Sequence, residues 1–143
     1  MMRLAPALFV VALAACHPSN DARRSGQTRY QGHTLAEWWA SRRGPDAATE
    51  HEAQMAMHML GAAAVPFLAD KAASNDLGDM IGGSTALESL CTSAIPAMQA
   101  ARAQYPSAAL DAAIRRVQAE EAARVAEGTC APNGEPTIPE SRH

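Results

Sequence analysis

Apolar and small side chains recur at helical spacing in the middle of the chain, and the same pattern occurs twice. The segment 53–72 reads AQMAMHMLGAAAVPFLADKA, and the segment 83–102 reads GSTALESLCTSAIPAMQAAR. Both place such residues at i, i+3, i+4 and i+7, the stripe that covers one face of a helix. The stripe is Ala53, Ala56, Met57 and Leu60 in the first copy, and Gly83, Ala86, Leu87 and Leu90 in the second. Each copy continues Ala-[Val/Ile]-Pro, and proline is tolerated in the first turn of a helix. The pattern therefore predicts two helix pairs, each with a tight turn before Pro66 or Pro96.

A further helix is expected on each side of these pairs. Thr34 and Glu37 have the spacing of a capping box, which predicts a helix from Leu35 that ends at Gly44-Pro45. Downstream, Pro106-Ser107 precede a last helix, whose apolar face is Leu110, Ile114 and Val117. Beyond this face the helix is polar, with Glu120 and Arg124 as a favourable i, i+4 pair. We expect this second half to project into solvent.

The two copies resemble the HEAT family of helical repeats, particularly the short bacterial kind related to the HEAT-like repeats of phycobilisome lyases. The shared features are the pair of Leu or Met residues that closes the first helix, then Gly61 or Cys91, then Ala-[Val/Ile]-Pro-x-[Leu/Met]. The resemblance implies an all-α fold over residues 34–127, a short α-solenoid of HEAT-like helix pairs. Because Gly82-Gly83 replace the usual helix formers in the second copy, we expect its first helix to be frayed near 79–84.

The segment before the first pair is similar to the opening Tyr-x-Gly-x-x-Leu-x-x-Trp of bacterial HEAT proteins. Tyr30, Gly32, Leu35 and Trp38 follow this opening with at most one altered spacing. A terminal repeat has no neighbour to cover its apolar face. Trp38 or Trp39 is therefore expected to close the open end of the stack.

Residues 1–15 have the organisation of a secretion signal. One arginine, Arg3, precedes the apolar run from Leu4 to Ala15, which is shorter than the roughly 20 residues that a membrane span needs. The run ends Leu13-Ala14-Ala15-Cys16, which resembles the lipobox of bacterial lipoproteins. This resemblance implies that Cys16 is acylated and becomes the mature N-terminus, although an ordinary signal peptide cut near Ala15 is the alternative. His17 in place of Asp implies, by analogy with enterobacterial lipoproteins, transfer to the outer membrane.

The regions outside the repeat domain lack apolar periodicity. Residues 16–33 are interpreted as the acylated cysteine and a flexible tether, and residues 128–143, rich in turn formers, as a disordered tail. The mature protein is thus expected to be anchored in the bacterial cell envelope, facing the periplasm.

The composition limits the apolar surface that the core can bury and the classes of partner that the chain can bind. Alanine supplies 33 residues, nearly half of the 48% hydrophobic fraction, and it buries little surface while favouring helix. The formal net charge of −3, with no basic stripe, counts against nucleic-acid binding.

Cys91 and Cys130 remain as a pair in a chain that is expected to be exported to an oxidising compartment. If successive helices alternate in direction, both cysteines lie at the same end of the bundle. We expect a disulfide between them, and the alternatives are two free thiols or a metal site.

The remaining side chains that could take part in chemistry are more simply explained as ordinary surface or core residues. His51 and His58, with Glu52 nearby, are too few ligands for a metal site and are expected to be exposed histidines on a polar helix face. Met55, Met57, Met59 and Met80 have the composition of a soft-metal or adaptable binding patch, but methionines at helical spacing are more often core. Gly78, Gly82 and Gly83 follow no strand, so they are not a phosphate loop. No catalytic, cofactor or metal residue is predicted.

These expectations favour a non-catalytic adaptor that binds another envelope protein, with no small-molecule substrate. The alternatives are an immunity or inhibitor lipoprotein that blocks a secreted enzyme, and an enzyme of the HEAT-like lyase type. The argument for protein binding is an analogy between folds.

Overall fold

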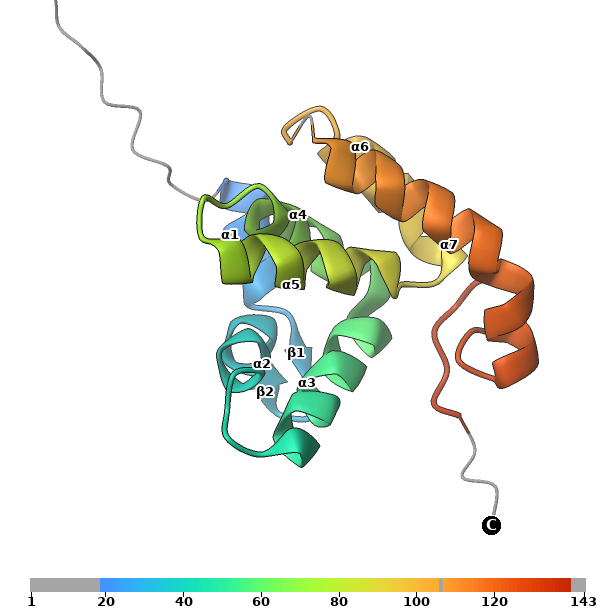
Figure 1. Cartoon of the computed structure of the whole chain (residues 1–143), viewed down its shortest axis with the longest axis horizontal. Helices are drawn as coiled ribbons and strands as arrows, with labels where there is room; N and C mark the ends of the chain where they lie inside the picture. Colours follow the sequence, from blue (N-terminus) through green and yellow to red (C-terminus); the bar gives the residue numbers. More distant parts are fainter. Residues whose placement is uncertain (1–18, 106, 140–143) are drawn as a thin grey trace, which may run out of the picture.

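The computed structural model describes residues 19–105 and 107–139, and this part of the chain is mostly helical. Figure 1 shows α5 in front of α4, with the long helix α7 crossing at an angle beside them. The helices are α1 (Asn20–Gly26), α2 (Leu35–Ser41), α3 (Ala47–Leu60), α4 (Val65–Ala72), α5 (Leu77–Glu88), α6 (Ile95–Ala101) and α7 (Ala108–Glu127). Short 3-10 turns, η1 (Gly61–Ala64) and η2 (Thr92–Ala94), precede α4 and α6. None of these described helices is both long and apolar enough to cross a bilayer.

The two copies of the sequence pattern have the same local structure. Each is a helix, a 3-10 turn and a second helix with proline in its first turn, so the predicted helix pairs are confirmed as α3–α4 and α5–α6. The first helices of the pairs are capped by Asp46 and Asp76, whose carboxylates accept backbone N–H groups at the helix start.

A small hairpin leads into α2. Strands β1 (Arg29–Tyr30) and β2 (His33–Thr34) pair antiparallel through the two-residue loop Gln31-Gly32, where both residues have positive φ. Thr34 then forms the predicted capping box: its hydroxyl accepts the Glu37 N–H, and the Glu37 carboxylate accepts the Thr34 N–H at 2.6 Å. The hydrogen bond with the Thr34 backbone N–H, and then that with its hydroxyl, lower the pKa of Glu37.

The core follows the predicted stripes. The cluster contains the fully buried side chains Leu87 of α5, Leu90 just after it, Leu68 and Met98 of the second helices, and Leu110 of α7. Trp39 belongs to this cluster, whereas Trp38 packs in a smaller one with Ala53, Ala56 and Tyr30. Most side chains of α7 beyond Val117 are exposed, as expected, although Arg124 is not.

The expectation of a frayed helix near 79–84 is wrong. Helix α5 is continuous from Leu77, and the glycines in it permit close packing. A Cβ on Gly83 would lie 2.5 Å from the Ala72 nitrogen and 2.8 Å from the Leu68 oxygen. Helices α4 and α5 therefore approach so closely that only glycine fits between their backbones.

The prediction of a flexible tether is also wrong for the described part of residues 16–33. Ser19 caps α1, whose buried face consists of the small residues Ala22, Ser25 and Gly26. The Ser25 hydroxyl donates to the Ala63 carbonyl at 2.5 Å and accepts the Phe67 N–H at 3.2 Å. Helix α1 is thus held on α4 by small side chains and one buried hydroxyl, and it contributes no large apolar residue of its own.

The prediction of a disordered tail is wrong for residues 128–139. Gly128 ends α7 in the left-handed conformation, and the chain folds back through a tight turn at 131–135. The Thr137 N–H donates to the Thr129 carbonyl at 2.9 Å, and the Gly134 carbonyl accepts the Ser93 N–H at 3.0 Å. The turn formers here build an ordered segment, because its backbone groups find partners in α7 and η2. We call residues 128–139 the C-terminal segment.

Candidate functional site

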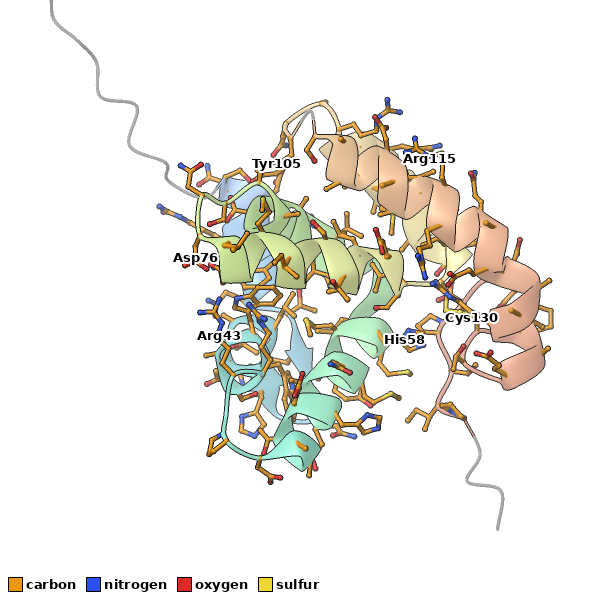
Figure 2. The ribbon with its side chains drawn as sticks, viewed as in Figure 1. Arg43, His58, Asp76, Tyr105, Arg115 and Cys130 are labelled. Carbon is orange, nitrogen blue, oxygen red and sulfur yellow. A yellow bond between two sulfur atoms is a disulfide. The ribbon has the colours of Figure 1, made fainter. Side chains whose placement is uncertain are left out.

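Residues from distant parts of the sequence meet where the end of α3 faces the C-terminal segment. Figure 2 shows His58 of α3 pointing toward Cys130 across this junction. Cys91 and Cys130 are joined by the disulfide expected from the sequence, with their Cα atoms 5.8 Å apart. Both cysteines are buried. The disulfide therefore links the loop after α5 to the C-terminal segment in the interior of the protein.

His58 lies beside this disulfide and is buried, so the expectation of an exposed histidine is wrong at this position. Its Nδ1 is 3.1 Å from the Ser89 carbonyl, its Nε2 is 2.8 Å from the Thr129 carbonyl, and its Nε2 is 3.9 Å from the sulfur of Cys91. A carbonyl oxygen only accepts hydrogen bonds, so in each contact the facing ring nitrogen is the donor when it carries a hydrogen. His58 thus connects three segments of the chain: α3, the end of α5 and the C-terminal segment.

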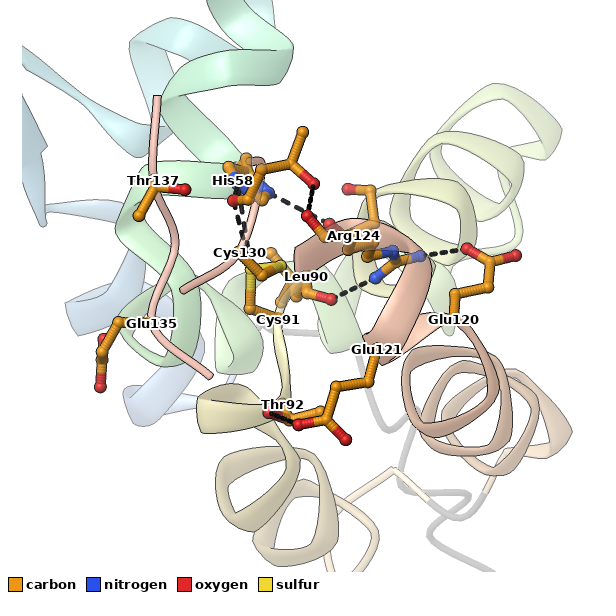
Figure 3. Close-up of a disulfide and its surroundings, with 12 residues drawn as sticks. His58, Leu90, Cys91, Thr92, Glu120, Glu121, Arg124, Cys130, Glu135 and Thr137 are labelled. Atoms are coloured by element: carbon orange, nitrogen blue, oxygen red, sulfur yellow. Dashed lines mark hydrogen bonds and ion pairs between the residues drawn. A yellow bond between two sulfur atoms is a disulfide. The ribbon is translucent and has the colours of Figure 1, made fainter. Parts of the chain in front are cut away.

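Arg124 also contacts the end of α5, and it connects this end to α7 (Figure 3). Its guanidinium donates to the Glu88 carbonyl at 2.5 Å and to the Leu90 carbonyl, and its side chain is 12% exposed. These carbonyls belong to the last turn of α5 and the residues after it, where they lack intrahelical partners. The predicted pair with Glu120 is confirmed at 2.6 Å, and this hydrogen bond lowers the pKa of Glu120.

A groove of about 500 Å³ opens beside His58, between α3, α5 and the C-terminal segment. Its lining contains more polar than apolar side chains. Its residues include His51, Gln54 and Met55 from α3, Thr85 and Ser89 from α5, and Thr129 and Pro139 from the C-terminal segment. The groove gives a solvent path to His58, which is itself part of the lining.

A charged cluster closes the other end of α5. The Arg42 guanidinium stacks 3.8 Å from the centre of the Trp39 ring, and it lies 3.4 Å from Asp79. Arg43 and Lys71 contact the same carboxylate at 3.3 and 3.5 Å. Burial lowers the pKa of Arg42, with a further contribution from the neighbouring Arg43, while Asp79 opposes this shift. The cluster fixes α2 against the start of α5.

One face of α5 carries large apolar side chains that no described residue covers. Leu77 is 64% exposed, Ile81 56% and Met80 39%. The spacing of these residues at i, i+3 and i+4 places them together on one helix face. We call Leu77, Met80 and Ile81 the α5 apolar face.

The other residues singled out from the sequence lie in different parts of the structure. His51 is exposed, as expected, and lines the groove, whereas Met57 lies in the core. Met55 and Met59 are half-buried, and Met80 belongs to the α5 apolar face, so the four methionines form no common patch. The predicted acylation site, Cys16, lies outside the described residues.

Sequence analysis missed the contact between His58 and the cysteine pair. No fixed spacing in the sequence predicts this contact, because the position of Cys130 depends on how the C-terminal segment folds back. One signal was present: His58 directly follows Met57 of the buried stripe, so it lies near the edge of the core face.

Scans of protein-family models, curated proteins and solved structures find no match to this chain.

Proposed function

We propose that this chain is a lipid-anchored bacterial envelope protein whose helical domain binds another envelope protein without catalysing a reaction. In this proposal Cys16 carries the acyl chains, and the protein faces the periplasm from the outer membrane. The pairs α3–α4 and α5–α6 are two HEAT-like units of a short α-solenoid. Their matched order of helix, 3-10 turn and proline-containing helix supports this assignment.

The observation that carries the binding role is the α5 apolar face. Three large apolar side chains on one face are costly to leave in water, at about 25 cal/mol per Å² of apolar area. A contiguous exposed apolar patch on a folded domain is typical of a contact surface. The partner chemistry that fits is a protein surface with an aliphatic or aromatic centre, surrounded by polar groups that meet the charged cluster around Asp79.

A pair of substitutions with matched exposure tests this role. Ile81 and Ile138 are 56% and 58% exposed, but Ile138 lies on the C-terminal segment, away from the α5 apolar face. In the native cells, a photo-crosslinking amino acid at position 81 should give a discrete adduct with one envelope protein, whereas position 138 should not. Purified partner should then bind the wild-type chain and Ile138→Glu equally, and bind Ile81→Glu at least tenfold more weakly.

The outcomes separate the candidate functions. Equal crosslinking and equal binding for the two positions would refute the α5 apolar face as the contact surface. A tight, stoichiometric adduct with a secreted enzyme would replace the adaptor role with the immunity or inhibitor role. The mass of the N-terminal peptide, compared between the native protein and Cys16→Ala, tests the lipid anchor separately.

A further inference from the structure

We propose that His58, Cys91 and Cys130 form a metal site when the disulfide is reduced, and that the site takes a thiolate-preferring divalent cation such as Zn²⁺. The ligand atoms of these three buried residues all lie within 4.8 Å of one another. They come from α3, the loop after α5 and the C-terminal segment, so a bound cation would replace the covalent link between these segments. This inference is independent of the proposed binding of a partner protein.

The distance between nitrogen and sulfur suits a shared metal ion. On a tetrahedral Zn²⁺, with Zn–S near 2.3 Å and Zn–N near 2.0 Å, a sulfur and a nitrogen ligand lie about 3.5 Å apart. The distance between His58 Nε2 and Cys91 Sγ is 3.9 Å. Once the disulfide is reduced, the two sulfurs separate to at least van der Waals contact, as two thiolate ligands require. Small side-chain rotations therefore complete the site without a backbone rearrangement.

The surroundings of His58 provide a second, independent argument. Its Nδ1 faces the Ser89 carbonyl at 3.1 Å, the arrangement by which a metal-ligating histidine is usually oriented through its other nitrogen. Its Nε2 faces two electron-rich groups, the Thr129 carbonyl at 2.8 Å and the Cys91 sulfur. A lone pair on Nε2 would repel both, so Nε2 needs either a hydrogen to donate or a cation to bind at this point. In the disulfide form an Nε2–H that donates to the Thr129 carbonyl fills this place, and in the reduced form a cation held by Nε2 and the two thiolates fills it.

The chemistry balances with a dithiol as reductant. The dithiol gives two electrons and two protons to the Cys91–Cys130 bond, which becomes two thiols, and the dithiol itself becomes a disulfide. When the cation binds, each thiol releases its proton and becomes a thiolate ligand, and the proton on Nε2 of His58 also leaves. The cation enters through the groove, which reaches His58 and Thr129. Water or the Thr129 carbonyl fills the fourth position.

Cobalt(II) is the probe that reports on these ligands directly. The experiment uses the full chain with Cys16→Ser, so that the thiols of the proposed site are the only ones present. After reduction with a phosphine and removal of the reductant without oxygen, Co²⁺ should give thiolate charge-transfer bands in the near ultraviolet. Intense visible bands typical of tetrahedral cobalt should appear with them. Both sets should saturate at one cobalt per chain and disappear when Zn²⁺ is added.

Two histidines on the same helix supply a matched pair of variants. His58→Ala should weaken Co²⁺ binding at least tenfold and shift the visible bands. His51→Ala, which changes an exposed histidine of the same groove, should alter neither property. The oxidised chain should show no thiolate bands. Zn²⁺ should raise the melting temperature of the reduced chain but not that of the oxidised chain.

Three results would overturn the proposal. The first is the absence of thiolate bands in a reduced chain that keeps its far-ultraviolet helical spectrum. The second is equal cobalt affinity in the wild type and in His58→Ala. The third applies if the reduced chain unfolds: the proposal then requires Zn²⁺ to restore its helical spectrum, and failure to do so contradicts it.

Discussion

The close approach of α4 and α5 makes Gly83→Ala a stringent test of the fold. In most helices this change stabilises, because alanine exceeds glycine in helix propensity by about 1 kcal/mol. Here the added Cβ would lie 2.5 Å from the Ala72 nitrogen and 2.8 Å from the Leu68 oxygen. Both neighbours are backbone atoms, which cannot rotate away as a side chain can. The helices must therefore separate by about 1 Å, and overpacking of this kind typically costs about 1–3 kcal/mol.

The propensity gain of about 1 kcal/mol offsets part of this cost, so Gly83→Ala should lower the free energy of unfolding by up to about 2 kcal/mol. Gly78→Ala is the matched control, because Gly78 lies in the same helix and is exposed. A Cβ there would displace the guanidinium of Arg43, the end of a flexible and exposed side chain, and would lie 3.3 Å from Oδ1 of Asp76. Gly78→Ala should accordingly stabilise the protein by a few tenths to about 1 kcal/mol.

Urea unfolding, followed by far-ultraviolet circular dichroism, measures both free energies. The two alanine variants should shift the midpoint in opposite directions with little change in slope. If Gly83→Ala stabilised the protein as much as Gly78→Ala does, the tight packing of α4 on α5 would be refuted. The result would then favour the frayed helix that the glycine pair suggests from sequence.

Three further predictions concern the crosslink, the helix cap and acid. Replacing the disulfide by Cys91→Ser with Cys130→Ser opens a loop with a sequence separation of 39. It should lower the free energy of unfolding in urea by about 4 kcal/mol; a loss below 1 kcal/mol would contradict the chain-entropy argument. Thr34→Ala should lower it by about 1 kcal/mol, while Thr34→Ser, which keeps the hydroxyl, should leave it nearly unchanged. The pKa values of Glu37 and Asp76 are lowered in the folded protein, chiefly by hydrogen bonds from backbone N–H groups. Their ionised forms therefore stabilise the fold above the unfolded pKa, and this stability is lost as the pH falls below about 5. Melting temperatures between pH 7 and pH 3 should show the loss, and Glu37→Gln should reduce it.

The parts of the fold that the sequence predicted correctly are those that bury large side chains at regular spacing. The stripes ending in Leu60 and Leu90, and the face of α7 from Leu110 to Val117, lie in or against the core as expected. Helix starts were also predictable, because Thr34 and the prolines act within one turn of chain. Local chemistry and helical periodicity therefore sufficed for the all-α class.

The errors share one physical cause, which is burial without large apolar side chains. Helix α1 packs through Ala22, Ser25 and Gly26, none of which raises a hydrophobic periodicity signal. The C-terminal segment is held by backbone hydrogen bonds and by Cys130, and its prolines and glycines resemble those of a disordered tail. In an alanine-rich chain, small residues permit close approach between backbones. Composition alone does not distinguish this close packing from a lack of structure.

The same cause explains why the candidate metal ligands were not predictable as a group. His58 lies near Cys130 only because the C-terminal segment returns to the end of α3. That return depends on Gly128 at the end of α7 and on the Arg124 carbonyl, which accepts the Thr129 N–H at 3.0 Å. These contacts fix the C-terminal segment to the end of α7, and Arg124 fixes that end to the Glu88 and Leu90 carbonyls, so the three ligands meet only while α7 is docked. The ligand set is thus a consequence of the tertiary fold, and a change that undocks the end of α7 should remove it even with all three ligands present.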